Sequence, residues 1–242
     1  MKEVRMMIKI DVKGDVVDND TGQFFDYWGM QYVSPQVVKE SLDKAQGDEV
    51  ELDIASYGGD VFAASEIYTM INQYSGNVTG VIQGMAASAA TIIAEACDHL
   101  IISPAGQMMI HKASTVGVGN SDDFTHTAGV LNTTDRTIAS IYQSKTGKSE
   151  DEILNLMKQE TYLTAQDAVK QGFADEIMKI NDKVPQVVNG LHEIPSKDAV
   201  KKFKNLIQSQ KGIDSNSKQF ENDALFNEKL AMLKGENNGN TN

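Results

Sequence analysis

One serine lies in a run of small residues, Gly84-Met85-Ala86-Ala87-Ser88-Ala89-Ala90, which follows the apolar segment 78–83. If that segment is a buried strand and a helix begins near Ser88, the serine occupies a turn whose free N–H groups point outward. Such a turn suits a nucleophile. Small residues are equally typical of a helix packed closely on a sheet, with serine as its cap, so this stretch alone leaves both interpretations open.

A second turn of small residues, Gly58-Gly59, follows an alternating strand pattern at 50–54 and precedes a helical pattern at 61–74. The same strand, turn and helix order recurs at 78–96, so we expect an α/β fold with parallel strands and right-handed crossovers. Both turns would then lie at the carboxyl edge of the sheet, where α/β folds place ligands. The N–H groups of Gly59 and Ala89 are candidates for an oxyanion hole. A phosphate-binding loop is the alternative, but neither a P-loop lysine nor a G-x-G-x-x-G pattern is present.

A serine nucleophile needs a base, and histidine is the side chain that titrates near neutral pH. Of the four histidines, His99 begins a strand pattern, His126 lies in an expected exposed helix and His192 lies in a polar segment. His111 differs because it ends the apolar run 108–110, which would place its ring at the same sheet edge as Ser88. Catalysis and a purely local role are both compatible with its spacing alone.

The remaining patterns surround this core with further elements. We expect a first strand at 6–12, a Ser34-capped helix to about 44, a strand at 100–102 and a closing strand at 175–180. The aromatic stretch 24–30 is interpreted as core, with an interface as the alternative. A helix from Phe124 to Lys145 has only a sparse apolar stripe, which suggests burial against another subunit. Capping patterns predict two shorter helices, at 149–158 and 164–172.

Composition restricts the class of protein. The net charge is −12, with 13 basic against 27 acidic residues in 1–182 and 9 against 7 in 183–242. An acidic surface argues against nucleic acid as a partner. No segment has the length and hydropathy of a membrane span or a secretory signal, so a cytoplasmic protein is expected. The single cysteine, Cys97, excludes an intrachain disulfide and a paired-cysteine metal site. We predict a domain at 1–182 and a C-terminal extension at 183–242, with helices near 197–208 and 223–233 and a polar, disordered end.

Taken together, four motifs resemble the Clp protease proteolytic subunit (ClpP) family in order and interval over about residues 6–180. They are Ser56-Tyr57-Gly58-Gly59, Gly84–Ser88, Met109-Ile110-His111 and the segment from Tyr162-Leu163-Thr164-Ala165 to Gly172. The resemblance implies a ClpP/crotonase-like β/α spiral core and a protruding handle helix. The helix predicted at 124–145 falls at the position of this handle helix. The resemblance also implies a serine endopeptidase in a ring-shaped homo-oligomer that needs no cofactor or metal.

Carried over by position, Ser88 would be the nucleophile, His111 the general base, and Gly59 with Ala89 the oxyanion hole. The family's aspartate falls on Glu160, whose extra methylene changes its reach. Asp135 and Asp175 are the alternatives for the third member, and a plain surface role for Glu160 stays open. The α/β-hydrolase elbow is excluded because Ala86-x-Ser88-x-Ala90 is not G-x-S-x-G.

Two departures refine the resemblance. Tyr57 stands where housekeeping members usually have proline, and the chain continues far past the family's usual end. Both features are more like the ClpP-related head maturation proteases of phages and prophages, whose substrates are capsid or scaffold proteins in a procapsid. The alternatives are a housekeeping-like peptidase with an ATPase partner, a crotonase-type acyl-CoA enzyme, and a non-catalytic assembly protein.

Overall fold

The computed structural model describes residues 7–179. The chain divides into two units, Met1–Asp182 and Lys183–Asn242, and all described residues lie in the first. The helices predicted near 197–208 and 223–233, the polar end and His192 lie outside the described residues. The domain boundary at 182 therefore stays a prediction.

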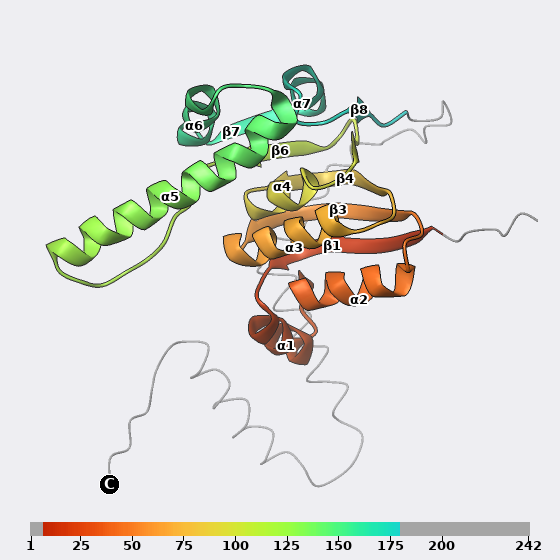
Figure 1. Ribbon diagram of the computed structural model, residues 1–242, viewed down its shortest axis with the longest axis horizontal. Coiled ribbons are helices and arrows are strands. Elements are labelled where there is room, and N and C mark those ends of the chain that lie inside the picture. The colour runs from red at the N-terminus through yellow and green to blue at the C-terminus, as the bar shows by residue number, and fades with distance from the viewer. Residues whose placement is uncertain (1–6, 180–242) are drawn as a thin grey trace, which may run out of the picture. The chain divides into compact units, whose positions relative to one another are not determined.

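The described residues alternate between strands and helices along most of the chain (Figure 1). The strands are β1 (Ile8–Val16), β2 (Tyr32–Val33), β3 (Val50–Gly59), β4 (Val78–Ala87), β5 (His99–Ile102), β6 (Gln107–Ile110), β7 (Thr161–Thr164) and β8 (Glu176–Ile177). The helices are α1 (Asn19–Trp28), α2 (Pro35–Ala45), α3 (Val61–Gln73), α4 (Ala89–Ala94), α5 (Ser121–Thr146), α6 (Glu150–Lys158) and α7 (Ala165–Gln171).

The sheet runs in the order β2-β1-β3-β4-β5-β8, and every neighbouring pair in this path is parallel. The predicted parallel arrangement of the two strand, turn and helix units is thus confirmed. Parallel strands buried on both faces need apolar side chains throughout, and β3 and β4 supply them with Leu52, Ile54 and Ile82, all fully buried. Cys97 is buried in this core, as expected for a small core residue.

Two features of the sheet were not predicted. Along β4, residues 79–82 pair with β5, whereas residues 85–87 pair with β6. β6 in turn pairs with β7, and this pair is antiparallel. Four-residue strands carry too little alternation to be recognised in the sequence, so the β6–β7 pair could not be placed there.

Local signals place the helix ends well. Ser149 and Glu152 form the capping box of α6, Thr164 caps α7, and Gly172 ends α7 at a positive φ of 84°. The long helix predicted from 124 to 145 is present as α5, which begins three residues earlier because Asn120 and Asp123 form a capping box. Of the closing strand predicted at 175–180, the described residues 175–179 form only β8, and residue 180 lies outside the described range.

The interpretation of the aromatic stretch 24–30 as core was wrong. Its residues form much of α1, and the side chains of Phe24, Tyr27 and Met30 are 46%, 67% and 38% exposed. Rings of this segment pack on one another, as Tyr27 does edge-to-face on Trp28. The stretch therefore covers little of the sheet, and its exposure leaves the interface alternative open.

A buried carboxylate distinguishes the end of α4. Glu95 is 7% exposed, and neither of its carboxyl oxygens has a hydrogen-bond partner within the described residues. Burial raises the pKa of Glu95 well above its ordinary value, and the nearby Asp175 adds to this, while Lys145 opposes it. The folded protein thus holds this proton more tightly than the unfolded chain does.

We expect Glu95→Met to stabilise the fold, because methionine fills the same space without a polar group that lacks a partner. Leaving such a group buried costs about 1–3 kcal/mol, which is the expected gain near neutral pH. The pKa of Glu95 is higher in the folded protein than in the unfolded chain. The free energy of unfolding of the wild type therefore falls as the pH rises from the unfolded pKa toward the folded pKa.

The gain should therefore be larger at pH 8 than at pH 5, as measured by urea unfolding of both proteins. An equal gain at the two pH values would show that Glu95 does not bind its proton more tightly in the folded state.

Candidate active site

Ser88 joins β4 to α4 through a strained backbone. Its φ and ψ are 54° and −126°, a region that non-glycine residues rarely occupy. Strain of this kind costs about 1–3 kcal/mol and is concentrated at functional sites. The turn expected from the small-residue run is therefore present, and Ser88 is not a simple helix cap, since its side chain makes no capping bond to α4.

β6 brings a second residue to this turn. The pairing of Ala87 with Met109 is continued by a backbone hydrogen bond from Ser88 N to Met109 O of 2.8 Å. His111 follows two residues after Met109, just beyond the end of β6. Its Nε2 lies 2.6 Å from Ser88 Oγ. In the tautomer with an unprotonated Nε2, the serine hydroxyl donates this bond, which is the arrangement needed to activate it.

The glycine turn at the end of β3 lies directly against the Ser88 turn. A Cβ on Gly58 would lie 2.8 Å from Ala89 N, and Gly58 itself has a φ of 91°. Ala89 is the first residue of α4, so its N–H has no acceptor within the helix. Gly59, with a φ of 150°, approaches Val16 O so closely that no side chain would fit there. The two candidate oxyanion donors therefore come from adjoining turns at one edge of the sheet.

A buried serine fixes the shape of the glycine turn. Ser56 Oγ donates to Gly14 O at 2.6 Å and accepts from Gly58 N at 3.1 Å. One hydroxyl thus ties the end of β3 to β1 and to its own turn. Asp60 then caps α3 by accepting from Ala63 N.

Glu160 directly precedes β7, and His111 directly follows β6. Thr161 pairs with Ile110 in the antiparallel β6–β7 ladder, so Glu160 and His111 are the next residues beyond the last pair of that ladder. Glu160 is exposed, has a positive φ of 50°, and accepts a hydrogen bond from Tyr162 Oη at 3.2 Å. In residues 7–179, no carboxylate forms an ion pair or hydrogen bond with the His111 ring.

The two alternative carboxylates lie in different places. Asp135, buried on α5, accepts from Ala113 N at 2.8 Å, and one of its oxygens lies 3.1 Å from Lys112 Nζ. Asp175 accepts from Leu100 N at 2.6 Å and from Lys145 Nζ at 2.7 Å. Leu100 is near the start of β5, whereas Ser88 follows the end of the parallel β4, so Asp175 lies at the opposite edge of the sheet.

The other histidines of the described region lie elsewhere. His99 lies near Asp175 and Glu176, and His126 lies on the exposed first half of α5. No group of three or more His, Cys, Asp or Glu side chains within residues 7–179 is arranged to hold a metal ion. None of the helices in that range is long and apolar enough to cross a membrane.

Sequence reasoning missed two polar residues behind the nucleophile. Thr91 Oγ1 donates to Ser88 O at 2.5 Å, and it lies 2.6 Å from the Tyr142 hydroxyl of α5. Thr91 could be suspected only from its place one turn after Ser88. Tyr142 lies within the helix predicted at 124–145, but the sparse apolar stripe of that helix gives no sign of a hydroxyl bond.

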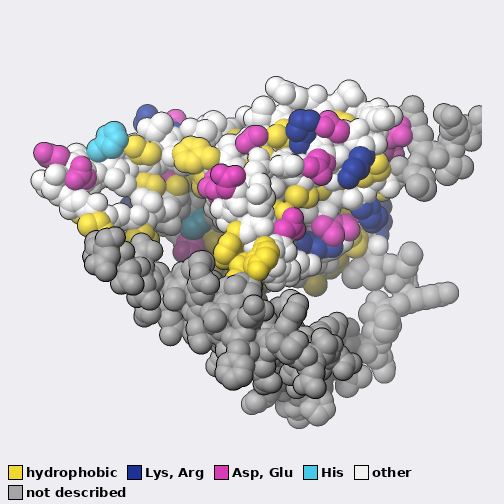
Figure 2. All heavy atoms as spheres, turned by 90° about the horizontal axis from the view of Figure 1, so that it is seen from below, with side chains coloured by type: hydrophobic (Ala, Val, Ile, Leu, Met, Phe, Trp, Pro, Cys, Tyr) yellow, Lys and Arg dark blue, Asp and Glu magenta, His cyan; other side chains and the backbone are white. Residues whose placement is uncertain are grey.

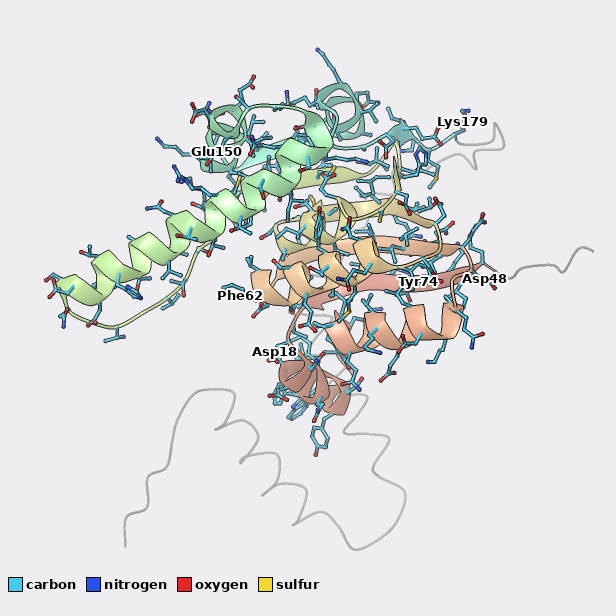
Figure 3. The ribbon with its side chains drawn as sticks, in the orientation of Figure 1. Asp18, Asp48, Phe62, Tyr74, Glu150 and Lys179 are labelled. Carbon is cyan, nitrogen blue, oxygen red and sulfur yellow. The ribbon has the colours of Figure 1, made fainter. Side chains whose placement is uncertain are left out.

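A groove begins at Val61, two residues after the candidate oxyanion donor Gly59, and its lining includes neither Ser88 nor His111. It has a volume of about 860 Å³ and lies between the first turns of α3 and one face of α5. Phe62, at the end of α3 nearest α5 in Figure 3, is 72% exposed beside it. Figure 2 shows hydrophobic side chains along the projecting arm, which consists of α5 and the loop that precedes it. The lining combines Val61, Phe62, Val130 and Ile138 with serine and threonine side chains, and it also includes Asp122 and His126.

We expect Gly58→Ala to disrupt the Ser88 turn, because the added Cβ would lie 2.6 Å from Ala87 O. A displacement near 1 Å costs roughly 100-fold in rate, and that loss is expected in the rate of Ser88 labelling by a small fluorophosphonate. Gly84→Ala is the matched control, because an added Cβ there meets no atom within 4 Å. Similar labelling rates in the two variants would contradict this assignment of the glycine turn.

Comparisons with known proteins agree with this geometry. The family model "Clp protease" matches residues 30–181. An ATP-dependent Clp protease proteolytic subunit from Bacteroides fragilis is 27% identical over 158 residues, covering 64% of this chain and 75% of the relative. One from Ligilactobacillus salivarius is 30% identical over 138 residues, covering 56% and 70%.

The fold is shared with a solved structure of the same kind. A point mutant of ClpP1 from Listeria monocytogenes superposes with a TM-score of 0.60 at 20% identity, covering 72% of this chain and 93% of that one. The predicted ClpP-like α/β fold is confirmed by this likeness. Since the family model spans more than half of the sequence, the chain belongs to the Clp protease family of serine-type peptidases.

Proposed function

We propose that this chain cleaves peptide bonds through an acyl-enzyme formed on Ser88, with His111 as general base. The observation that carries the proposal is the 2.6 Å contact between Ser88 Oγ and His111 Nε2 at the carboxyl edge of a parallel sheet. A histidine within hydrogen-bond reach can activate a serine hydroxyl, and backbone strain is concentrated at functional sites, whereas packing alone needs neither.

In this mechanism His111 accepts the proton of Ser88 Oγ as the hydroxyl attacks the peptide carbonyl carbon. The N–H groups of Gly59 and Ala89 stabilise the oxyanion of the tetrahedral intermediate. His111 then gives the proton to the leaving amine, and the acyl-enzyme remains on Ser88. Water, activated by the same histidine, attacks the ester carbon and releases the acid product.

Glu160 is the third member of the proposed triad. Its position at the same end of the β6–β7 ladder as His111 supports this role, whereas Asp175 lies at the other edge of the sheet. The bond from Tyr162 Oη occupies one oxygen of Glu160, which leaves the other available to an imidazole N–H. Rotation of this exposed side chain toward Nδ1 would stabilise the imidazolium that forms during catalysis.

The groove between α3 and α5 supports a preference for apolar substrate side chains. Its first residues, Val61 and Phe62, follow the proposed oxyanion donor Gly59 by two and three positions. A substrate carbonyl held at that donor would therefore have an adjoining side chain close to apolar surface.

A fluorophosphonate series tests the catalytic assignment. We expect the probe to label Ser88 in the native protein, to give no adduct in Ser88→Ala, and to react at least ~1,000-fold more slowly with His111→Ala, which lacks the base. For Glu160→Gln, we expect peptide hydrolysis to slow by roughly 10-fold or more, because the charge that supports the imidazolium is lost. Mass spectrometry locates the adduct, and peptide assays give the rates.

Two substitutions serve as controls for this series. His99→Ala removes a histidine that lies near Asp175 and Glu176, away from the groove, and Glu150→Gln removes a half-exposed carboxylate that pairs with Arg136. Both should retain the native rates. Labelling of another residue would refute Ser88 as nucleophile, and full activity in Glu160→Gln would leave a Ser88–His111 dyad.

We further propose that the protein acts as a phage or prophage head maturation protease, in a ring-shaped homo-oligomer. Tyr57 in the glycine motif and the 60 residues beyond position 182 support this finer assignment, since both depart from housekeeping members. The proposed substrates are capsid or scaffold proteins, cleaved inside a procapsid in the cytoplasm without an ATPase partner.

The proposed substrate class is tested by sequencing the gene neighbourhood and incubating the protein with any capsid and scaffold precursors encoded there. We expect the purified native protein to cleave a precursor in the absence of ATP, and Ser88→Ala to leave it intact, because only the native chain has the nucleophile. Denaturing gels and mass spectrometry of the fragments measure this. Cleavage that requires an unfoldase ATPase, or a gene neighbourhood without portal and capsid genes, would instead favour the housekeeping alternative.

A further inference from the structure

The second half of α5 lies behind the Ser88–His111 pair. The first half of the helix projects from the body, whereas Asp135, Ile138, Ala139 and Tyr142 are buried (Figure 1). Asp135 and Tyr142 are seven residues apart, which places them about two turns apart on one face of the helix. Each makes a polar contact to a segment that carries one member of the pair.

Asp135 holds the chain directly after His111. β6 ends at Ile110, so His111 begins a connection of ten residues that leads to α5. Asp135 accepts the backbone N–H of Ala113 at 2.8 Å through one oxygen and pairs with Lys112 at 3.1 Å through the other. Asp135 is 4% exposed, so its bond to Ala113 N–H is shielded from water, whereas the Lys112 side chain of the ion pair is 39% exposed.

Tyr142 holds the turn that contains Ser88. The hydroxyl hydrogen of Thr91 is donated to Ser88 O, so the 2.6 Å contact between Thr91 Oγ1 and Tyr142 Oη is donated by the tyrosine. Burial raises the pKa of the Tyr142 phenol, which keeps this donor protonated in the neutral range. Ser88 O also accepts from Thr91 N at 2.9 Å. A strained residue persists only where such surrounding contacts fix it.

We propose that Asp135 and Tyr142 are positioning residues through which α5 holds His111 and Ser88 in register. The proposal rests on the catalytic role given above to that pair. Neither side chain touches the reacting atoms. Asp135 acts through residues 112–113 on the base, and Tyr142 acts through Thr91 on the nucleophile. Their loss should therefore lower kcat and leave KM for a small peptide unchanged.

Asp135→Ala, Asp135→Asn and Tyr142→Phe test the two contacts in the full-length protein. We expect Asp135→Ala to slow both kcat and Ser88 labelling by fluorophosphonate by about 10- to 100-fold, because the segment after the base is released. Asp135→Asn keeps an oxygen for Ala113 N–H, so it should recover most of that loss. Tyr142→Phe removes one neutral hydrogen bond and should slow labelling by roughly 3- to 10-fold.

Two matched controls separate positioning from general stability. Asp175 has the same kinds of partner as Asp135, one backbone N–H and one lysine, at the opposite edge of the sheet. Tyr74 Oη donates to Asp48 O at 2.8 Å and accepts from Gly47 N, and Figure 3 shows Tyr74 and Asp48 together at the edge remote from Phe62. Asp175→Asn and Tyr74→Phe should keep the native labelling rate even where they lower stability.

The final extent of Ser88 labelling distinguishes a positioning role from a purely structural one. Positioning variants should be labelled slowly but to completion, since every subunit is folded, whereas a destabilised variant should lose labelled sites. Native rates in Asp135→Ala and Tyr142→Phe, or equal losses in the two controls, would overturn the positioning role alone. An unlabelled Ser88 in the native protein would overturn the proposed function and this role together. If Asp135→Ala fails to fold, the comparison of Tyr142→Phe with its control Tyr74→Phe decides whether α5 positions the Ser88 turn.

Discussion

The candidate site depends on a change of neighbour along β4. Residues 79–82 of this strand pair with β5, and residues 85–87 pair with β6, so β4 continues beyond the point where β5 ends. Because the β4–β6 pairing is parallel, the strands end at the same edge, and Ser88 and His111 follow those ends. The hydrogen bond from Ser88 N to Met109 O then fixes the register. A slip of one residue would turn the His111 ring to the other face of the sheet.

Small residues are needed at the site because three backbone segments meet there. Gly58 lies within contact of Ala87 O and Ala89 N, and Gly59 lies against Val16 O, so neither position has room for a Cβ. A small residue is not required at every position of the run, since a Cβ at Gly84 would meet no atom within 4 Å. The sequence run 84–90 therefore combines packing and chemistry: Ala87 and Ala89 allow the close approach, and Ser88 carries the strained turn between them.

Much of this arrangement could be predicted from the sequence, and the failures share a physical cause. Strong local signals placed the parallel units, the capping boxes and the juxtaposition of Ser88 with His111. The β6–β7 pair was missed because four-residue strands depend on tertiary contacts. The register that brings Glu160 and His111 to the same end of this ladder was therefore missed as well. The aromatics of α1 were assigned to the core from composition alone, although burial is decided by the face that a helix presents to the sheet.

The polar residues on α5 show what a hydrophobic stripe conceals. Buried Ile138 and Ala139 attach the helix to the body without fixing its rotation, because apolar contacts are not directional. Asp135 and Tyr142 flank them and have hydrogen-bond geometry to satisfy, so they allow one rotation and one axial position of the helix. A helix held in this way transmits its position to residues 112–113 and to Thr91. Whatever contacts the projecting half of α5 would then bear on the distance between Ser88 Oγ and His111 Nε2, which couples the arm of the molecule to its proposed chemistry.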